Sequence, residues 1–206
     1  MKQIICAAVL AVCTFGVQAQ EKKFHFGAKA GAQSTTITGD EEDVSARIGA
    51  HVGVFGEYMI NDKFSIQPEL VFSMQGADSD VEENVFGENY KGEWVKLNYL
   101  NLPVLVKYHF SGVKGLSVGV GPQVGFLLSA KQKYTTSVEG VTTEHEDDVK
   151  DNLKSIDFGL TAGAEYELPV HVFFGIRAYQ GFMNINDIDN DKAYNSVFQL
   201  SAGYRF

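Results

Sequence analysis

Cysteine is almost absent from this sequence of 206 residues, because Cys6 and Cys13 are the only two. Both lie in an N-terminal segment with a basic start, an apolar run over residues 4–17 and small residues leading up to Ala19. This pattern predicts that residues 1–19 are a secretory signal peptide, which is removed. The remaining chain would then have no thiol for a disulfide, for catalysis or for a metal site.

Long hydrophobic runs, proline and basic residues are also scarce. Outside the N-terminal segment no stretch reaches the roughly 18 apolar residues of a transmembrane helix, which excludes a helical membrane protein. Only 4 prolines accompany 21 glycines and 12% aromatic residues, a composition typical of a β protein. The formal net charge of −9 argues against nucleic acid as a partner.

Apolar and polar residues alternate with a period of two, which indicates β-strands. The alternation predicts eight strands, at residues 22–34, 45–60, 63–76, 93–110, 114–129, 153–168, 170–182 and 195–206. Three connectors are tight, and four are long and polar: residues 35–44, 77–92, 130–152 and 183–194. This alternation of short and long connectors predicts an all-β, eight-stranded antiparallel up-and-down transmembrane β-barrel over residues 20–206, with both termini periplasmic.

Each predicted strand has an apolar face and a face of glycine and charge. The lumen of an eight-stranded barrel is too narrow for the bulky apolar side chains, so we expect them to point outward. Buried charges persist only when they are paired. We therefore expect a lumen ion-pair network that packs and braces the barrel, formed by Lys29, Glu57, Glu69, Lys107, Asp157, Glu165, Glu167, Arg177 and Arg205.

Two further features bear on the barrel wall. Pro68, Pro103 and Pro122 fall inside predicted strands, and proline lacks the donor that a ladder needs, so bulges or lost hydrogen bonds are expected there. Aromatic residues gather where the strands meet the short turns, as in an interfacial girdle. They are Phe24, Tyr58, Phe64, Tyr108, Phe110, Tyr166, Tyr204 and Phe206.

Several segments together resemble the PorT-like "porin family" outer-membrane β-barrel domain. They are FGAKAGAQ (26–33), FGEYMINDKFSIQPELVFSMQGA (55–77), KLNYLNLPVLVKYHF (96–110), GVGPQVGFLLSAK (119–131) and FQLSAGYRF (198–206). The resemblance implies a barrel in the outer membrane of a Gram-negative cell envelope, in contact with outer-membrane lipid, and it implies no activity. The end of the chain, with Tyr204 and Phe206, resembles the signal that the barrel assembly machinery recognises.

Residues that could carry chemistry are few. Asp187, Asp189 and Asp191 alternate in the last long connector and are the candidate calcium ligands, although the glycine and closing glutamate of an EF-hand are missing. His145 stands alone in an acidic connector without a nucleophile signature, and no glycine-rich phosphate loop precedes a helix. We therefore expect no enzyme activity and no cofactor.

Three functional hypotheses remain open from the sequence. The first is a monomeric outer-membrane barrel with a structural or interaction role. Its four acidic extracellular loops, with 18 of the 26 acidic residues, would contact an extracellular or envelope protein. The second is a narrow channel for small solutes. The third is a secreted soluble ligand-binding barrel with its apolar face inward.

Overall fold

The computed structural model describes residues 23–40, 44–79, 82–85, 88–138, 141–188 and 191–206. The predicted signal peptide lies outside these ranges. Within them, no helix is long and apolar enough to cross a membrane. The elements are β1 (Phe24–Gly39), β2 (Val44–Met59), β3 (Phe64–Ser79), β4 (Glu82–Val85), β5 (Glu88–His109), β6 (Leu116–Val138), β7 (Val141–Asp148), the 3-10 turn η1 (Lys150–Asn152), β8 (Ile156–Glu167), β9 (Val172–Gly181) and β10 (Ala193–Arg205).

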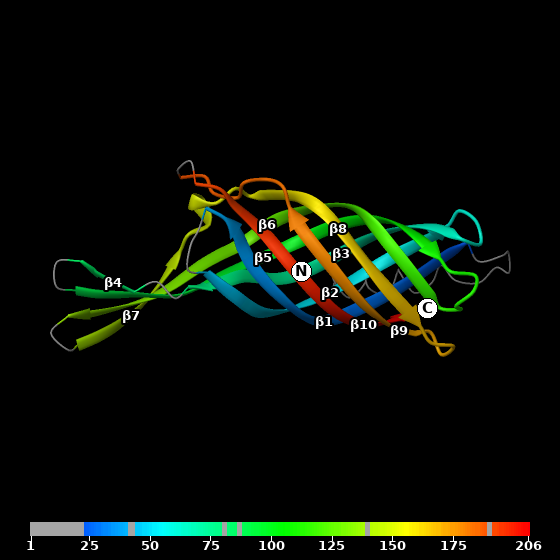
Figure 1. Cartoon of the computed structure of the whole chain (residues 1–206), viewed down its shortest axis with the longest axis horizontal. Helices are drawn as coiled ribbons and strands as arrows, with labels where there is room; N and C mark the ends of the chain where they lie inside the picture. Colours follow the sequence, from blue (N-terminus) through cyan, green and yellow to red (C-terminus); the bar gives the residue numbers. More distant parts are fainter. Residues whose placement is uncertain (1–22, 41–43, 80–81, 86–87, 139–140, 189–190) are drawn as a thin grey trace, which may run out of the picture.

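Eight of the strands form a closed antiparallel barrel, which confirms the predicted fold (Figure 1). Each of β1, β2, β3, β5, β6, β8, β9 and β10 pairs with the next, and β1 closes the barrel on β10 with Gly31 opposite Ser201. The backbone N–H of Phe206 donates to the carbonyl of Phe26, so both described ends of the chain lie side by side. We call their end of the barrel the short-turn end and the opposite end the long-connector end.

Two of the predicted long loops are largely β-structure, which corrects the loop assignment for residues 77–92 and 130–152. β5 and β6 continue past the barrel, β4 pairs with β5, and β7 pairs with β6. The four strands form a sheet in the order β4–β5–β6–β7 that projects beyond the barrel (Figure 1). The polarity of these segments suggested loops, but Tyr134, Thr135 and Thr136 are residue types that strands favour.

The two faces of the barrel wall differ as predicted. Val104, on the apolar face of β5, is 42% exposed, whereas Lys107 on the polar face of the same strand is 2% exposed. The same alternation of exposed apolar and buried polar residues runs along the other strands. An apolar exterior around a polar interior excludes the secreted soluble barrel, which would have to turn its apolar face inward.

The three prolines interrupt the ladder without shifting its register. Pro68 pairs with Val104, and the next pair along the same ladder is Val71 with Asn101. Between β5 and β6, the pair of Pro103 with Gln123 is followed by the pair of Val106 with Val120, so Pro122 lies in a similar gap. The expectation of local disruption is therefore confirmed as lost pairing rather than as bulges.

The aromatic side chains at the short-turn end contact one another on the outer wall. The ring centroids are 5.3 Å apart for Phe24 and Tyr58, and 5.3 Å apart for Phe64 and Tyr108. Tyr204 likewise lies 5.3 Å from Phe206. Tyr and Phe at this position match the aromatic belt found where a barrel meets the membrane interface.

Candidate functional site: the lumen and the projecting sheet

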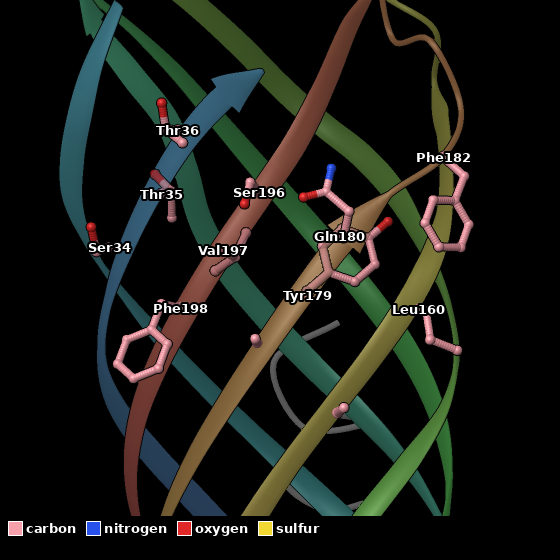
Figure 2. A pocket seen from close by; sticks show the side chains of 12 residues that line it. Ser34, Thr35, Thr36, Leu160, Tyr179, Gln180, Phe182, Ser196, Val197 and Phe198 are labelled. Atoms are coloured by element: carbon pink, nitrogen blue, oxygen red, sulfur yellow. The ribbon is translucent and has the colours of Figure 1, made fainter. Parts of the chain in front are cut away.

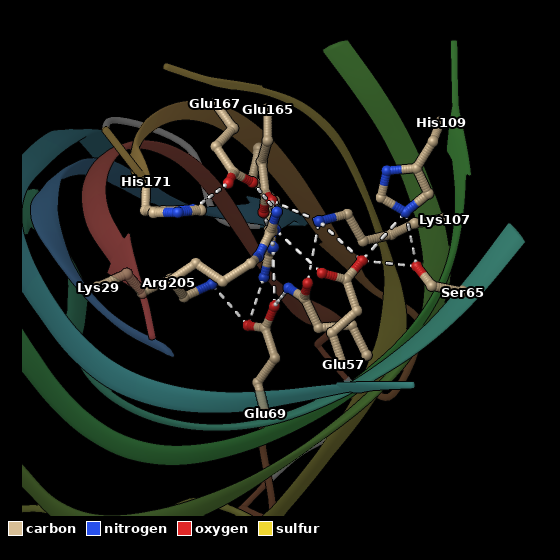
Figure 3. Close-up of polar contacts among 12 residues, drawn as sticks. Lys29, Glu57, Ser65, Glu69, Lys107, His109, Glu165, Glu167, His171 and Arg205 are labelled. Carbon is tan, nitrogen blue, oxygen red and sulfur yellow. Dashed lines mark hydrogen bonds and ion pairs between the residues drawn. The ribbon is translucent and has the colours of Figure 1, made fainter. Parts of the chain in front are cut away.

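Glu69 pairs with two buried cations in the lumen (Figure 3). Lys29 Nζ lies 2.5 Å from Glu69 Oε2, and Arg177 Nη1 lies 2.7 Å from the same oxygen. Arg177 Nη2 donates to Glu69 Oε1 at 2.9 Å, so the arginine contacts both carboxylate oxygens. The side chain of Glu69 is 0% exposed and that of Lys29 is 2% exposed. A bidentate arginine and a lysine together give this buried carboxylate strong, charge-assisted hydrogen bonds.

A second group of charges continues from Arg177 toward the short-turn end. Lys107 Nζ is 2.6 Å from Glu165 Oε2 and 3.6 Å from Glu57 Oε1. Arg205 Nη2 is 3.0 Å from Glu57 Oε2, and its Nη1 contacts Glu167. Arg177 joins the two groups, because its Nη2 is 3.2 Å from Glu165 Oε1.

Eight of the nine predicted lumen residues thus lie in one continuous set of ion pairs, which we call the lumen network. It contains four positive and four negative side chains, so its formal charge is zero: Lys29, Lys107, Arg177 and Arg205 against Glu57, Glu69, Glu165 and Glu167. Neutrality satisfies the requirement that buried charges be compensated.

Asp157 is the exception and lies apart from the lumen network. It follows the first residue of β8 at the long-connector end, eight residues before Glu165, which corresponds to about 27 Å along a strand. Its Oδ2 accepts a hydrogen bond of 2.9 Å from Asn195 Nδ2, and Asn195 also contacts the Tyr99 hydroxyl at 3.3 Å. Asp157 therefore belongs to a separate polar group. The alternation of residues predicts that a side chain faces the lumen, but it does not predict the position of that side chain along the barrel axis.

Sequence reasoning missed several further partners of the lumen network. Gln67 bridges its two groups, since its Nε2 donates to Glu69 Oε1 at 2.7 Å and its Oε1 accepts from Lys107 at 2.9 Å. Ser65 Oγ donates to Glu57 Oε1 at 2.6 Å, and His109 Nε2 lies 3.1 Å from that oxygen. Ser65, Gln67 and Glu69 alternate along β3, and that spacing was the available signal.

The long-connector end of the lumen holds an apolar cluster that was also missed. Leu97, Tyr99 and Ile185 are each 0% exposed and pack with Leu127, Ala130 and Ala193. We call these six residues the lumen plug. Ile185 comes from the connector between β9 and β10, which folds inward over the barrel. The expectation of a lumen filled by glycine and charge therefore holds for only part of its length.

The projecting sheet is braced by contacts between β6 and β7. Lys131 Nζ is 2.5 Å from Glu146 Oε1, and Lys133 Nζ is 3.1 Å from Glu144 Oε2. On the opposite face the ring of Tyr134 stacks on that of His145, with centroids 4.9 Å apart. These pairs join β6 and β7 on both faces of the projecting sheet, and half of the residues of β7 are acidic.

The remaining predicted site residues show no assembled site. Asp187 lies in a polar pocket that also includes two lysines, and Asp189 lies outside the described residues. Over the described ranges, no three His, Cys, Asp or Glu side chains come together as metal ligands would. Tyr204 and Phe206 lie on the outer wall at the short-turn end, 43% and 74% exposed. The calcium and assembly-signal hypotheses stay predictions.

A closed barrel with an apolar outer wall and a polar, charge-filled lumen defines the class of membrane-spanning β-barrels. The sequence profile of the family described as "Outer membrane protein beta-barrel domain" matches residues 18–187. The chain belongs to this family and is an outer-membrane β-barrel protein. The comparison with curated proteins found no significant match.

Solved structures of other outer-membrane proteins share the general shape of the barrel. Ail, the attachment invasion locus protein of Yersinia pestis, is 13% identical, with 89% of this chain and 99% of Ail covered and a TM-score of 0.48. Neisserial surface protein A is 11% identical, with 88% and 97% covered and a TM-score of 0.47. OprG from Pseudomonas aeruginosa is 15% identical, with 88% and 95% covered and a TM-score of 0.42. TM-scores this low add nothing to the barrel that the strand pairing already defines.

Proposed function

We propose that this protein is a monomeric outer-membrane barrel that does not conduct and that acts through contacts of its projecting sheet. The short-turn end, with both termini, faces the periplasm, and the acidic connectors and the projecting sheet are extracellular. The motifs QPEL, YLNLPVLVKY and GPQVGFLLSAK support a place among the PorT-like members of the family. Assembly would use Tyr204 and Phe206, and no enzymatic step is assigned.

The observation that carries this proposal is that the lumen is filled while the strands continue outside it. Ser65, Gln67 and Thr161 in the lumen are each 0% exposed, and the lumen plug fills the lumen at the long-connector end. A side-chain-filled lumen is what an eight-stranded barrel allows. By contrast, β5 and β6 extend into a sheet whose outer strand β7 pairs only with β6 among the described residues. An exposed strand edge offers backbone donors and acceptors to a protein partner.

Planar-bilayer recording tests whether the lumen conducts. We expect the wild-type protein to give no discrete conductance steps, because ion pairs and the lumen plug occupy the lumen. Steps that disappear when Glu69 or Arg177 is changed would instead establish the narrow channel and contradict the proposal.

Cysteine labelling of intact cells tests the orientation. Thr143, in β7, and Asp62, in the turn between β2 and β3, are both exposed. We expect a membrane-impermeant maleimide to label Thr143→Cys in intact cells and Asp62→Cys only after the outer membrane is permeabilised. Both native cysteines lie in the predicted signal peptide, so the unmodified protein serves as the unlabelled control. The reverse pattern would invert the proposed orientation.

A further inference from the structure

The outer wall at the long-connector end contains a groove that crosses four strands (Figure 2). Its floor consists of small residues, among them Ala162, Ala178 and Ser196, which lie on β8, β9 and β10. Phe182 and Phe198 stand beside them, 59% and 48% exposed. The volume of about 420 Å³ is within the usual range for ligand pockets. Because the groove is cut into the lipid-facing wall, acyl chains are its natural contents.

Polar groups interrupt the apolar wall along this groove. Gln180 faces outward, opposite Leu160 on β8 and Ser196 on β10. Thr36 on β1 is in turn the pairing partner of Ser196. Within the described part of the chain, the Gln180 amide forms one hydrogen bond, of 3.2 Å, from its Nε2 to the carbonyl of the next residue, Gly181. A polar group that faces hydrocarbon is costly unless a partner satisfies it. The ester or amide linkage of a bound lipid would supply such a partner.

A second, polar pocket of about 470 Å³ adjoins the groove at the same end. Tyr194 lines it and points to the same side of β10 as Ser196, about 7 Å farther along the strand. Among the described residues, Lys154, just before β8, and Lys192, just before β10, line it together with Asp187. Neither lysine side chain forms an ion pair within the described part of the chain. The two ammonium groups are therefore without a carboxylate partner at the edge of the apolar wall, while the nearby Asp40 carboxylate accepts a hydrogen bond from the backbone N–H of Lys192.

We propose that the groove and the polar pocket together bind one outer-leaflet lipid with a phosphate in its head group. An acyl chain lies over Ala162 and Ala178, the Gln180 amide meets the linkage region, and Lys154 and Lys192 contact the phosphate. The assignment to the outer leaflet rests on the orientation in the proposed function. A second copy of this chain is a less suitable occupant, because its apolar wall offers no anion to the two lysines.

Native mass spectrometry of the full-length protein in detergent micelles tests this site. The probes are dimyristoyl phosphatidic acid and the matching diacylglycerol, which differ only in the phosphate. We expect wild-type protein to prefer the phosphatidic acid, and the double variant Lys154→Gln, Lys192→Gln to lose about tenfold in affinity for it while its weak binding of diacylglycerol is unchanged. The double variant Lys63→Gln, Lys114→Gln at the short turns removes the same charge and should bind as wild type.

Filling the groove tests the acyl-chain half of the site. Ser196→Trp should lower the binding of both probes, and if this variant does not assemble, Ala178→Leu fills the same groove. The proposal would be overturned if the lysine variant kept its affinity for phosphatidic acid or if the groove variant bound both probes normally. It would also be overturned if the protein formed a dimer that the groove variant abolished. If lipid binding behaves as expected but the cysteine labelling is reversed, the site stands and the proposed orientation fails.

Discussion

Replacing Glu69 with glutamine is expected to lower the free energy of unfolding by about 3–5 kcal/mol, the cost of removing one partner of a buried ion pair. The substitution leaves Lys29 and Arg177 without their shared carboxylate, in a place where their side chains are only 2% and 8% exposed. Urea unfolding in lipid vesicles, followed by the fluorescence of the single tryptophan, Trp94, measures the change.

Two further variants separate the loss of charge balance from a general effect of substitution. Glu146→Gln removes an exposed pair with Lys131 in the projecting sheet, and it should cause no measurable change. Adding Lys29→Met to Glu69→Gln removes one positive charge and so restores the formal charge of the lumen network to zero. Arg177 still has Glu165 as a partner. The double variant should therefore be more stable than Glu69→Gln alone. If Glu69→Gln and Glu146→Gln behave alike, the lumen network does not stabilise the barrel.

Gly121→Ala is expected to prevent the barrel from closing normally, with a loss of about 3 kcal/mol or more of stability. A Cβ at this position would lie 1.9 Å from the carbonyl oxygen of Val104 on β5 and 2.9 Å from the Cα of Leu105. These are backbone atoms, so no side-chain rotation relieves the overlap. The two strands would have to separate further within the gap in their ladder, which lies between the pair of Pro103 with Gln123 and the pair of Val106 with Val120.

The measurement is the fraction of protein that shows the heat-modifiable gel mobility of a folded barrel. Gly112→Ala in the short turn between β5 and β6 is the matched control, since a Cβ there meets no atom within 4 Å. It should fold as wild type. A normal folded fraction for Gly121→Ala would mean that β5 and β6 approach each other less closely than the structure indicates.

The number of strands in the barrel and the orientation of its wall could be predicted from the sequence. Alternation with a period of two is a local property, and it separates Val104 from Lys107 without any knowledge of partners. The narrow lumen of an eight-stranded barrel then decides which face points inward. The ends of the strands could not be predicted as well, because the residues of β6 and β7 are polar although they favour strands. Hydrophobicity alone assigns such residues to a loop.

The partners in the lumen network depended on closure of the barrel. Arg177 and Glu69 are 108 residues apart in the chain and meet only because the strand registers around the whole barrel bring them to one height. The separation of Asp157 from that network and the inward fold of Ile185 have the same origin. A single strand reports which side of the wall a residue occupies, whereas its height and its neighbours across the lumen follow from the register of all eight strands.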